Sequence, residues 1–203
     1  ERKVELHKAA GFNALRMAHN PPSPALLDAC DRLGILVIDE AFDVWRYGHF
    51  KEDYSKHFDT LWREDLKKMI LRDRNHPSVI MWSIGNEIKH NETEEMALLS
   101  GKLADYVRSI DNTRPVTAGV NAVSEKKDAY LNTLDVAGYN YSPNEYVSGH
   151  QRHPEQLIYA SESYSSEAYD YWKAVEKYNW MIGDFVWTSF DYIGEASIGW
   201  NGY

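Results

Sequence analysis

Short strand-like runs alternate with helix-like segments along almost the whole chain. This alternation predicts an α/β fold with a parallel sheet, because each helix returns the chain to the edge where the next strand begins. Residues 35–38 read Ile-Leu-Val-Ile, a continuous apolar run typical of a strand that is buried on both faces. The predicted strands are residues 13–18, 35–38, 79–83, 116–119, 136–141, 157–161 and 182–188. One predicted helix ends at residue 10, and the others cover residues 24–33, 59–73, 93–110 and 167–178.

Seven predicted strands suggest a (β/α)8 TIM barrel rather than an open sheet. The chain begins with a helix and closes soon after a strand, so we expect a fragment that lacks the first strand and the last helix. Its 203 residues also fall short of the about 250 that such a barrel needs. An open doubly wound sheet is the alternative, but the sequence has neither a Gly-x-Gly-x-x-Gly loop nor a Walker-type loop to support it. Residues 1–203 are therefore interpreted as one partial TIM-barrel domain.

The charge and cysteine content exclude several classes of function. The chain has 22 Lys and Arg against 31 Asp and Glu, a net charge of −9, without the basic cluster that binding to nucleic acid needs. No apolar stretch is long enough to span a membrane, and the first residues do not form a signal peptide, so we expect a soluble protein, cytoplasmic or exported. Cys30 is the single cysteine, which excludes an internal disulfide and a cysteine-based zinc site, and we expect it to be a small buried apolar residue.

Aromatic residues make up 13% of the chain, with 7 Trp, 14 Tyr and 6 Phe. Aromatic faces stack on the C–H faces of sugars, so this content favours a carbohydrate partner, although the same residues also fill ordinary cores. We interpret one group as packing of a helix against the barrel: Tyr164, Tyr169, Tyr171 and Trp172. An open barrel would expose sheet edges, which favours association into a homo-oligomer.

Polar residues follow several of the predicted strands, where the active sites of such barrels lie. They are Arg16, His19, Asn20, Asp39, Glu40, Asn86, Glu87, Asn140, Tyr141, Glu162, Trp187 and Asp191. Glu87 and Glu162 are separated by 162 − 87 = 75 residues, so only the fold can bring them together. Two facing carboxyl groups are what cleavage of a glycosidic bond needs, because one protonates the leaving oxygen while the other attacks or activates water. Taken singly, either residue is equally well explained as a salt-bridged residue at the end of a strand.

Several motifs in order resemble the catalytic domain of glycoside hydrolase family 2, the family of β-galactosidases, β-glucuronidases and β-mannosidases. They are Gly11-Phe-Asn-Ala-Leu-Arg16-Met-Ala-His19-Asn-Pro, Asp31-Arg-Leu-Gly-Ile-Leu-Val-Ile-Asp-Glu40-Ala, the run from Arg72 to Glu87, Arg114-Pro-Val and Asp184-Phe-Val-Trp187. The resemblance implies a (β/α)8 barrel, flanking β-sandwich domains outside this chain, and a retaining double-displacement mechanism. It implies that Glu87 is the general acid/base, starting the cycle protonated, and that Glu162 is the nucleophile.

The resemblance also implies roles for the neighbouring residues. Asn86 corresponds to the donor to the sugar 2-hydroxyl, His19 to a sugar-binding histidine, and Trp187 to a stacking platform under the pyranose. Arg16 is expected to orient Glu162 from below, and Tyr141 to place its hydroxyl against the same carboxylate. Asp39 and Glu40 are expected in the pocket wall or just behind it.

The sequence departs from the family at points that bear on metals and substrate. The best-known bacterial β-galactosidase has a histidine three residues after its nucleophile, where this chain has Ser165, so its metal dependence does not transfer. The eight histidines show no metal-binding spacing, and we expect neither a metal nor a cofactor. The ending 187–195, Trp-Thr-Ser-Phe-Asp-Tyr-Ile-Gly-Glu, resembles galactosidase-like members and favours a β-galactosidase. A β-glucuronidase, a β-mannosidase and a non-catalytic carbohydrate-binding barrel are the alternatives.

Overall fold

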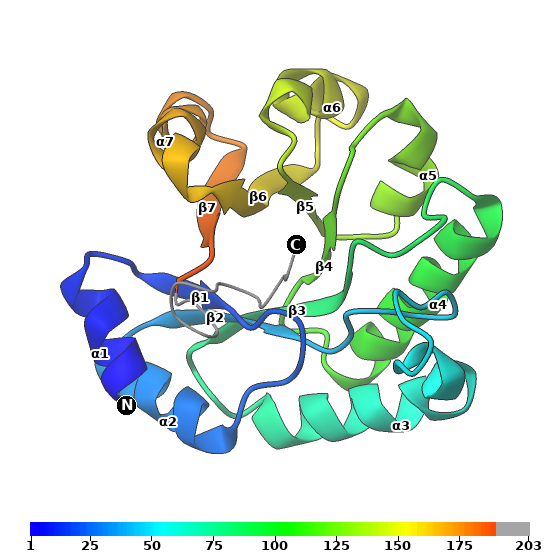
Figure 1. Ribbon diagram of the computed structural model, residues 1–203, viewed down its shortest axis with the longest axis horizontal. Helices are drawn as coiled ribbons and strands as arrows, with labels where there is room; N and C mark the ends of the chain where they lie inside the picture. Colours follow the sequence, from blue (N-terminus) through cyan, green and yellow to red (C-terminus); the bar gives the residue numbers. More distant parts are fainter. Residues whose placement is uncertain (190–203) are drawn as a thin grey trace, which may run out of the picture.

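The computed structural model describes residues 1–189, which contain a single sheet of seven parallel strands surrounded by helices (Figure 1). The strands pair in the order in which they occur along the chain, from β1 to β7. Their bounds are β1 Ala14–Arg16, β2 Leu36–Glu40, β3 Val79–Asn86, β4 Val116–Val120, β5 Val136–Asn140, β6 Leu157–Tyr164 and β7 Met181–Trp187. Consecutive parallel pairing around a common centre is the architecture of a TIM barrel, so the predicted fold class is confirmed.

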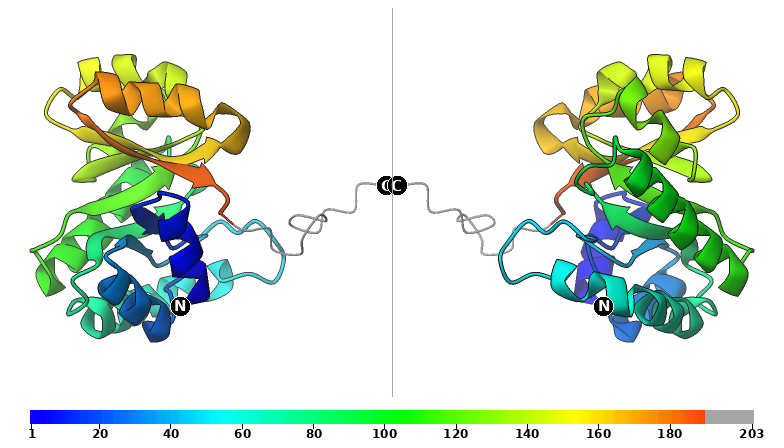
Figure 2. Two further views of the ribbon diagram at one scale, coloured as in Figure 1. Left: turned by 90° about the vertical axis from the view of Figure 1, so that its left-hand side faces the viewer. Right: turned by 90° about the vertical axis from the view of Figure 1, so that its right-hand side faces the viewer.

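Helices connect the strands and cover the outside of the sheet (Figures 1 and 2). They are α1 Arg2–Ala9, α2 Pro24–Leu33, α3 Ser55–Asp73, α4 Glu94–Ile110, α5 Asp128–Leu131, α6 Tyr146–Arg152 and α7 Ala168–Lys177, with short 3₁₀ turns at Glu125–Lys127, Pro143–Glu145 and Ser165–Glu167. The sequence analysis missed α5 and α6, because each is too short to show an amphipathic period. None of the helices within residues 1–189 combines the length and apolarity of a transmembrane segment.

Local signals explain where the helices begin and end. Helix α2 has Pro24 at its first position and ends at Gly34, whose φ of 69° lies in the left-handed region that glycine adopts at low cost. Helix α4 begins after Thr93, whose hydroxyl accepts a hydrogen bond from the Met96 amide at 3.3 Å. These boundaries follow the sequence prediction closely.

The apolar side chains form two clusters, one on each side of the sheet. The larger cluster lies between the strands and the helices and includes the fully buried Leu27, Cys30 and Leu66, which confirms the expectation for Cys30. The smaller cluster brings together side chains from four different strands: Ile38, Met81, Val136 and Tyr159. Side chains from strands that are not all neighbours can meet only across the barrel axis, so this cluster fills the interior.

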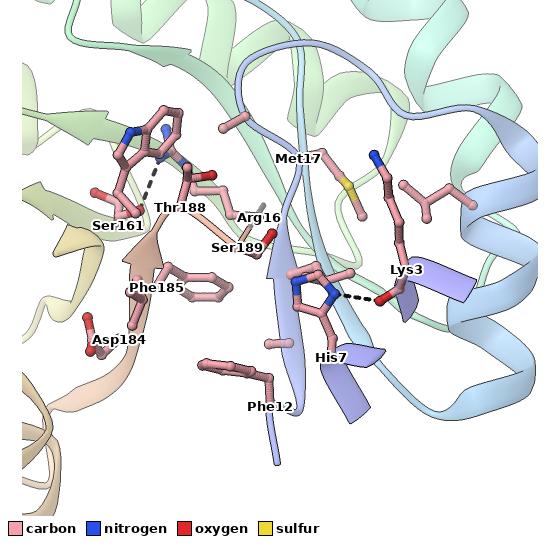
Figure 3. A pocket seen from close by; sticks show the side chains of 16 residues that line it. Lys3, His7, Phe12, Arg16, Met17, Ser161, Asp184, Phe185, Thr188 and Ser189 are labelled. Carbon is pink, nitrogen blue, oxygen red and sulfur yellow. Dashed lines mark hydrogen bonds between the residues drawn. The ribbon is translucent and has the colours of Figure 1, made fainter. Parts of the chain in front are cut away.

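The sheet is not closed within residues 1–189, because the ladder runs from β1 to β7 and no pairing joins these two strands. A groove of about 490 Å³ lies between them, lined by α1 and β1 on one side and by β7 on the other (Figure 3). This opening is where a closed (β/α)8 barrel has its remaining strand, in agreement with the predicted partial barrel. The predicted features at Asp191 and in 190–195 lie outside the described residues.

Candidate active site

The carboxyl ends of five strands bring a dense group of polar side chains together. Arg16 ends β1, Glu40 ends β2, Asn86 ends β3 with Glu87 next in the chain, Asn140 ends β5, and Glu162 lies near the end of β6. Parallel strands deliver all of their carboxyl ends to one rim of a barrel, which is why residues 146 positions apart can be in contact. The group occupies the centre of that rim, above the apolar side chains of the interior.

Arg16 is the hub of this group. Its guanidinium donates to both oxygens of Glu40 at 2.7 to 3.1 Å, to Oε1 of Glu162 at 2.8 Å, and to Oδ1 of Asn86 at 2.7 Å. The side chain of Arg16 is only 3% exposed, so these contacts replace its water shell. Burial by itself would lower the pKa of Arg16, but the carboxylates of Glu40 and Glu162 raise it, and the arginine stays charged. The guanidinium of Arg16 therefore fixes the positions of three acceptors from three different strands, Glu40, Asn86 and Glu162.

Glu162 is held at both of its oxygens. Arg16 donates to Oε1, and the Tyr141 hydroxyl donates to Oε2 at 2.7 Å. Burial, together with the charge of Glu162 and the hydrogen bond to it, raises the pKa of Tyr141, so the tyrosine stays a neutral donor. Tyr141 reaches this place with a φ of 50°, a left-handed conformation that is uncommon for a non-glycine residue, and its amide donates to the Glu162 carbonyl at 2.9 Å. The carboxyl group of Glu162 is thus held in one orientation, with a cation at one oxygen and a neutral hydroxyl at the other.

Glu87 lies in a different environment. Within residues 1–189, the one hydrogen bond recorded to its carboxyl group comes from the Asn140 amide, Nδ2 to Oε1 at 3.0 Å. The φ of Glu87 is 46°, again left-handed, as the chain leaves β3. The two carboxyl groups thus differ in their hydrogen-bond partners, which are a guanidinium and a hydroxyl for Glu162 and a neutral amide for Glu87.

The hydrogen-bond partners of Asn86 and Asn140 determine which way each side-chain amide is oriented. Oδ1 of Asn86 accepts from Arg16 and, at 2.9 Å, from Nδ2 of Asn140. Oδ1 of Asn140 accepts from the Ser161 hydroxyl at 2.5 Å, so its Nδ2 must be the group that faces Asn86 and Glu87. The Nδ2 group of Asn86 is therefore turned away from Arg16, towards His19, as a hydrogen-bond donor.

His19 and Trp187 form a stacked pair on the other side of Glu162. Nδ1 of His19 lies 2.8 Å from the Glu40 carboxylate, which only accepts, so this nitrogen carries a proton. Nε2 of the same ring lies 3.4 Å from Nδ2 of Asn86 and 3.7 Å from Oε1 of Glu162. The rings of His19 and Trp187 stack with centroids 5.2 Å apart and an angle of 9°. The imidazole is 21% exposed, so one edge of it is accessible from the rim, as are parts of Glu87 and Tyr141.

Glu40 and Asp39 face opposite sides of the sheet. Glu40 is fully buried beneath the rim, where Arg16, His19 and the Ser83 hydroxyl, at 2.6 Å, donate to it. Burial by itself would raise the pKa of Glu40, but the charge of Arg16 and these hydrogen bonds lower it. Asp39, which we expected in or behind the pocket wall, instead faces helix α3 and lies against the carboxyl group of Asp73. Because side chains alternate along a strand, neighbouring residues cannot both face the barrel interior.

Sequence reasoning placed Asn140 at a strand end without assigning it a role, and it did not identify Ser83 or Ser161. Asn140, Ser83 and Ser161 are fully or almost fully buried, and each donates to an acceptor of the polar group. Asn140 gave a usable signal, since it ends a predicted strand as Asn86 does. The two serines gave none, because a serine within an apolar run is compatible with ordinary packing.

The long connection from β2 to α3 packs against α3, α4 and the segment that follows β3. Arg46 in this segment pairs with Asp59 at 2.7 Å and with Glu95 of α4 at 2.9 Å, and Lys89 donates to the Gly48 carbonyl. Residues 141–153, which follow β5, are by contrast largely helical, since they contain the 3₁₀ turn Pro143–Glu145 and α6. The two segments thus differ in character, and only the first is an extended irregular connection.

One group of candidate metal ligands is present in the described part of the chain, away from the strand ends: Asp28, Asp31 and His76. Both oxygens of Asp31 are already engaged, one by His76 Nδ1 at 2.6 Å and the other by the Ser78 amide at 2.9 Å. These bonds tie α2 to the turn before β3, which accounts for Asp31 and His76 as structural residues.

A parallel barrel with two carboxyl groups in contrasting environments at its strand ends has the architecture of a glycoside hydrolase. The sequence pattern described as "Glycosyl hydrolases family 2, TIM barrel domain" matches residues 1–197, and the chain belongs to this family.

Relatives and solved structures agree with this assignment. The chain is 34% identical to "Beta-galactosidase BoGH2A" of Bacteroides ovatus, over 98% of this chain and 32% of that protein. It is 32% identical to "Putative beta-glucuronidase" of Formosa agariphila, over 97% of this chain and 23% of that protein. The crystal structure of a glycosyl hydrolase family 2 member from Bacteroides cellulosilyticus superposes with a TM-score of 0.95 and 66% identity, over all of this chain and 26% of that one. The chain thus spans about a quarter to a third of the length of these relatives.

Proposed function

We propose that this domain carries the active site of a retaining exo-β-glycosidase that hydrolyses terminal β-D-galactosides. The observation that carries the proposal is the contrast between the two carboxyl groups. Arg16 and Tyr141 hydrogen-bond to the two oxygens of Glu162, whereas the hydrogen-bond partner of Glu87 among the described residues is the neutral Asn140 amide, and Lys127 acts on Glu87 only through its charge. A double displacement needs this division between a charged nucleophile and a group that can carry a proton.

In the proposed first step, an oxygen of Glu162 bonds to the anomeric carbon while the bond from that carbon to the leaving oxygen breaks. Glu87 gives its proton to the leaving oxygen, so the departing group leaves as a neutral alcohol. In the second step, Glu87 takes a proton from water, and the water oxygen displaces Glu162 from the anomeric carbon. The sugar is released with its original configuration, and both carboxyl groups return to their starting states.

Neighbouring residues support these steps in the proposal. Nδ2 of Asn86, turned away from Arg16 by its partners, donates to the sugar 2-hydroxyl. His19 offers its exposed edge to a sugar hydroxyl, and Trp187 lies under the pyranose ring. Arg16 and Glu40 are almost completely buried, so they act on the substrate by orienting Glu162 and His19. None of these steps requires a metal or a cofactor.

The preference for galactosides rests on the resemblance of residues 187–195 to galactosidase-like members and on the names of the relatives. One relative is named a β-galactosidase and matches 98% of this chain, while another is named a putative β-glucuronidase and matches almost as much. A glucuronidase is therefore the second candidate. The structures of β-glucuronidases that superpose on this chain at 21% identity share its fold, and they carry no argument about its substrate.

Initial rates of the complete gene product on matched nitrophenyl β-galactoside, β-glucuronide, β-mannoside and β-glucoside test the proposal. We expect the galactoside to be preferred, and a fluorosugar that traps the intermediate to label Glu162. Glu162→Gln should abolish turnover, and Glu87→Gln should reduce it by about 10²- to 10⁴-fold on substrates with poor leaving groups. Glu94→Gln, at an exposed position at the start of α4, is the matched control. Near-normal rates in either active-site variant would overturn the assignment.

A further inference from the structure

Tyr164 lies two residues after Glu162 on β6, and both residues contact the same ring. Tyr141 donates its hydroxyl to Glu162, and its ring stacks on Tyr164 with centroids 4.4 Å apart and an angle of 26°. Tyr164 and Glu162 therefore face the same side of the strand. A strand advances about 3.3 Å per residue, so Tyr164 lies roughly 6.6 Å nearer the open rim than the carboxylate.

The exposure of Tyr164 corrects the expectation that it packs a helix against the barrel. Of the four aromatic residues interpreted in that way, only Tyr171 is buried, at 2% exposure, in edge contact with Tyr146. Tyr164 is 52% exposed even though Tyr141 covers part of it. One face of its ring thus packs on Tyr141, and much of the remainder is open to solvent.

The position of Tyr164 relative to Trp187 indicates which part of the site the exposed face of the Tyr164 ring borders. Tyr164 is the register partner of Trp187 on β7, so the two aromatic residues stand side by side at the ends of neighbouring strands. A terminal sugar held by Asn86 and Glu162 occupies the buried end of the site, because these side chains are only 6% and 4% exposed. The rest of the substrate then extends outward towards the rim, where Tyr164 is an exposed aromatic ring on the same strand as Glu162.

We propose that Tyr164 is the stacking platform of the leaving-group subsite and that it takes a pyranose ring. This inference rests on the proposed function, and it narrows the substrate class to β-linked disaccharides and longer glycans. A pyranose presents a C–H face and a fringe of hydroxyl groups, which match the apolar face and the hydroxyl of a tyrosine. Aromatic stacking also tolerates different sugars, so the platform favours a sugar as leaving group without selecting a single one.

The test compares two substrates with the same terminal sugar in the complete gene product. One is a β-linked disaccharide, whose leaving sugar can reach Tyr164, and the other is the methyl β-glycoside, whose leaving group is too small to reach it. In Tyr164→Ala, the ratio of kcat/KM for the disaccharide to that for the methyl glycoside should fall about three- to tenfold, the loss expected for one aromatic stack. Tyr164→Phe keeps the ring and should retain most of this ratio.

A second measurement separates a platform from a residue that only supports Tyr141. The glycosyl-enzyme partitions between water and an added free sugar acceptor, and the acceptor must bind in the leaving-group subsite. The proportion of transfer product should therefore fall in Tyr164→Ala. Tyr169→Ala is the matched control, because Tyr169 is 73% exposed on α7 and lies against Lys173. This control should leave both the substrate ratio and the transfer proportion at the parent values.

Two results would overturn the platform. An equal loss on both substrates, with unchanged partitioning, would mean that Tyr164 acts only through Tyr141, and unchanged kinetics would mean that it does not act at all. Failure of the proposed function has a different signature. In that case the parent protein hydrolyses neither substrate and the fluorosugar does not label Glu162. Both the proposed function and the proposed role of Tyr164 would then be refuted.

Discussion

Replacement of Asp39 by asparagine should stabilise the domain, increasingly so as the pH rises. Asp39 is fully buried between β2 and α3, and among residues 1–189 no N–H or O–H donor reaches either of its oxygens. Its partner is Asp73, whose own oxygens accept from Arg72 at 2.6 Å. Two carboxyl groups can share a hydrogen bond only if one of them carries the proton, and Asp73 is the one in direct contact with Arg72, which leaves the proton to Asp39. An asparagine at this position would donate its amide N–H to Asp73 without needing that proton.

The size of the effect follows from the displaced titration. Burial, the hydrogen bond to Asp73 and the charge of Asp73 raise the pKa of Asp39 from 3.8 to about 9. Between these two values the folded chain holds a proton that the unfolded chain releases, so the contribution of Asp39 to the free energy of unfolding falls as the pH rises. Each pH unit costs about 1.4 kcal/mol, which gives an upper bound of about 4 kcal/mol at pH 7. The loss continues up to pH 9 and then stops.

Urea unfolding at pH 5, 7 and 9, followed by tryptophan fluorescence, measures this dependence. The difference in unfolding free energy between Asp39→Asn and the parent should be small at pH 5 and should grow with pH. Asp170→Asn is the control, because the Asp170 side chain is 74% exposed and pairs only at the surface with Lys173. An Asp39→Asn variant that is less stable than the parent at pH 9, or whose difference does not change with pH, would refute the reasoning.

Three further predictions concern the network and the fold. Tyr141→Phe removes a hydrogen bond to a charged group, worth about 1.5–3 kcal/mol, and should lower kcat by about 10- to 150-fold; a change below threefold in steady-state rates would contradict this role. Asn140→Ala leaves Glu87 without its amide partner and should lower kcat at least about tenfold, at a cost in stability of about 1–3 kcal/mol; an equally active and stable variant would count against the network. Gly34→Ala should destabilise the domain by about 1 kcal/mol in urea unfolding, because its φ of 69° strains alanine although no atom lies within 4 Å of the added methyl; an unchanged midpoint would disprove this.

Position at the end of a strand was the most productive signal in the sequence. It placed Glu87 and Glu162 at one rim, since the carboxyl ends of parallel strands always meet there. The same rule listed Asn140 and Tyr141 among the polar residues of the rim, and both lie in the network. The rule works because both faces of such a strand are buried among apolar side chains, so its polar residues are mostly found at its ends.

The sequence by itself determined the order of strands and helices, the partial barrel and the pair of acidic residues, because hydrophobic runs, caps and breakers act over a few neighbours. The tertiary structure alone decided which way each side chain faces. Glu40 and Asp39 are neighbours in the chain, yet one holds Arg16 inside the barrel and the other meets Asp73 of α3. Strand register, with its irregularities beside Asn86 and Asn140, sets these directions, and it depends on contacts between segments far apart in the sequence. Tyr164 shows the same limit, since only the fold puts its open face above Glu162 rather than under a helix.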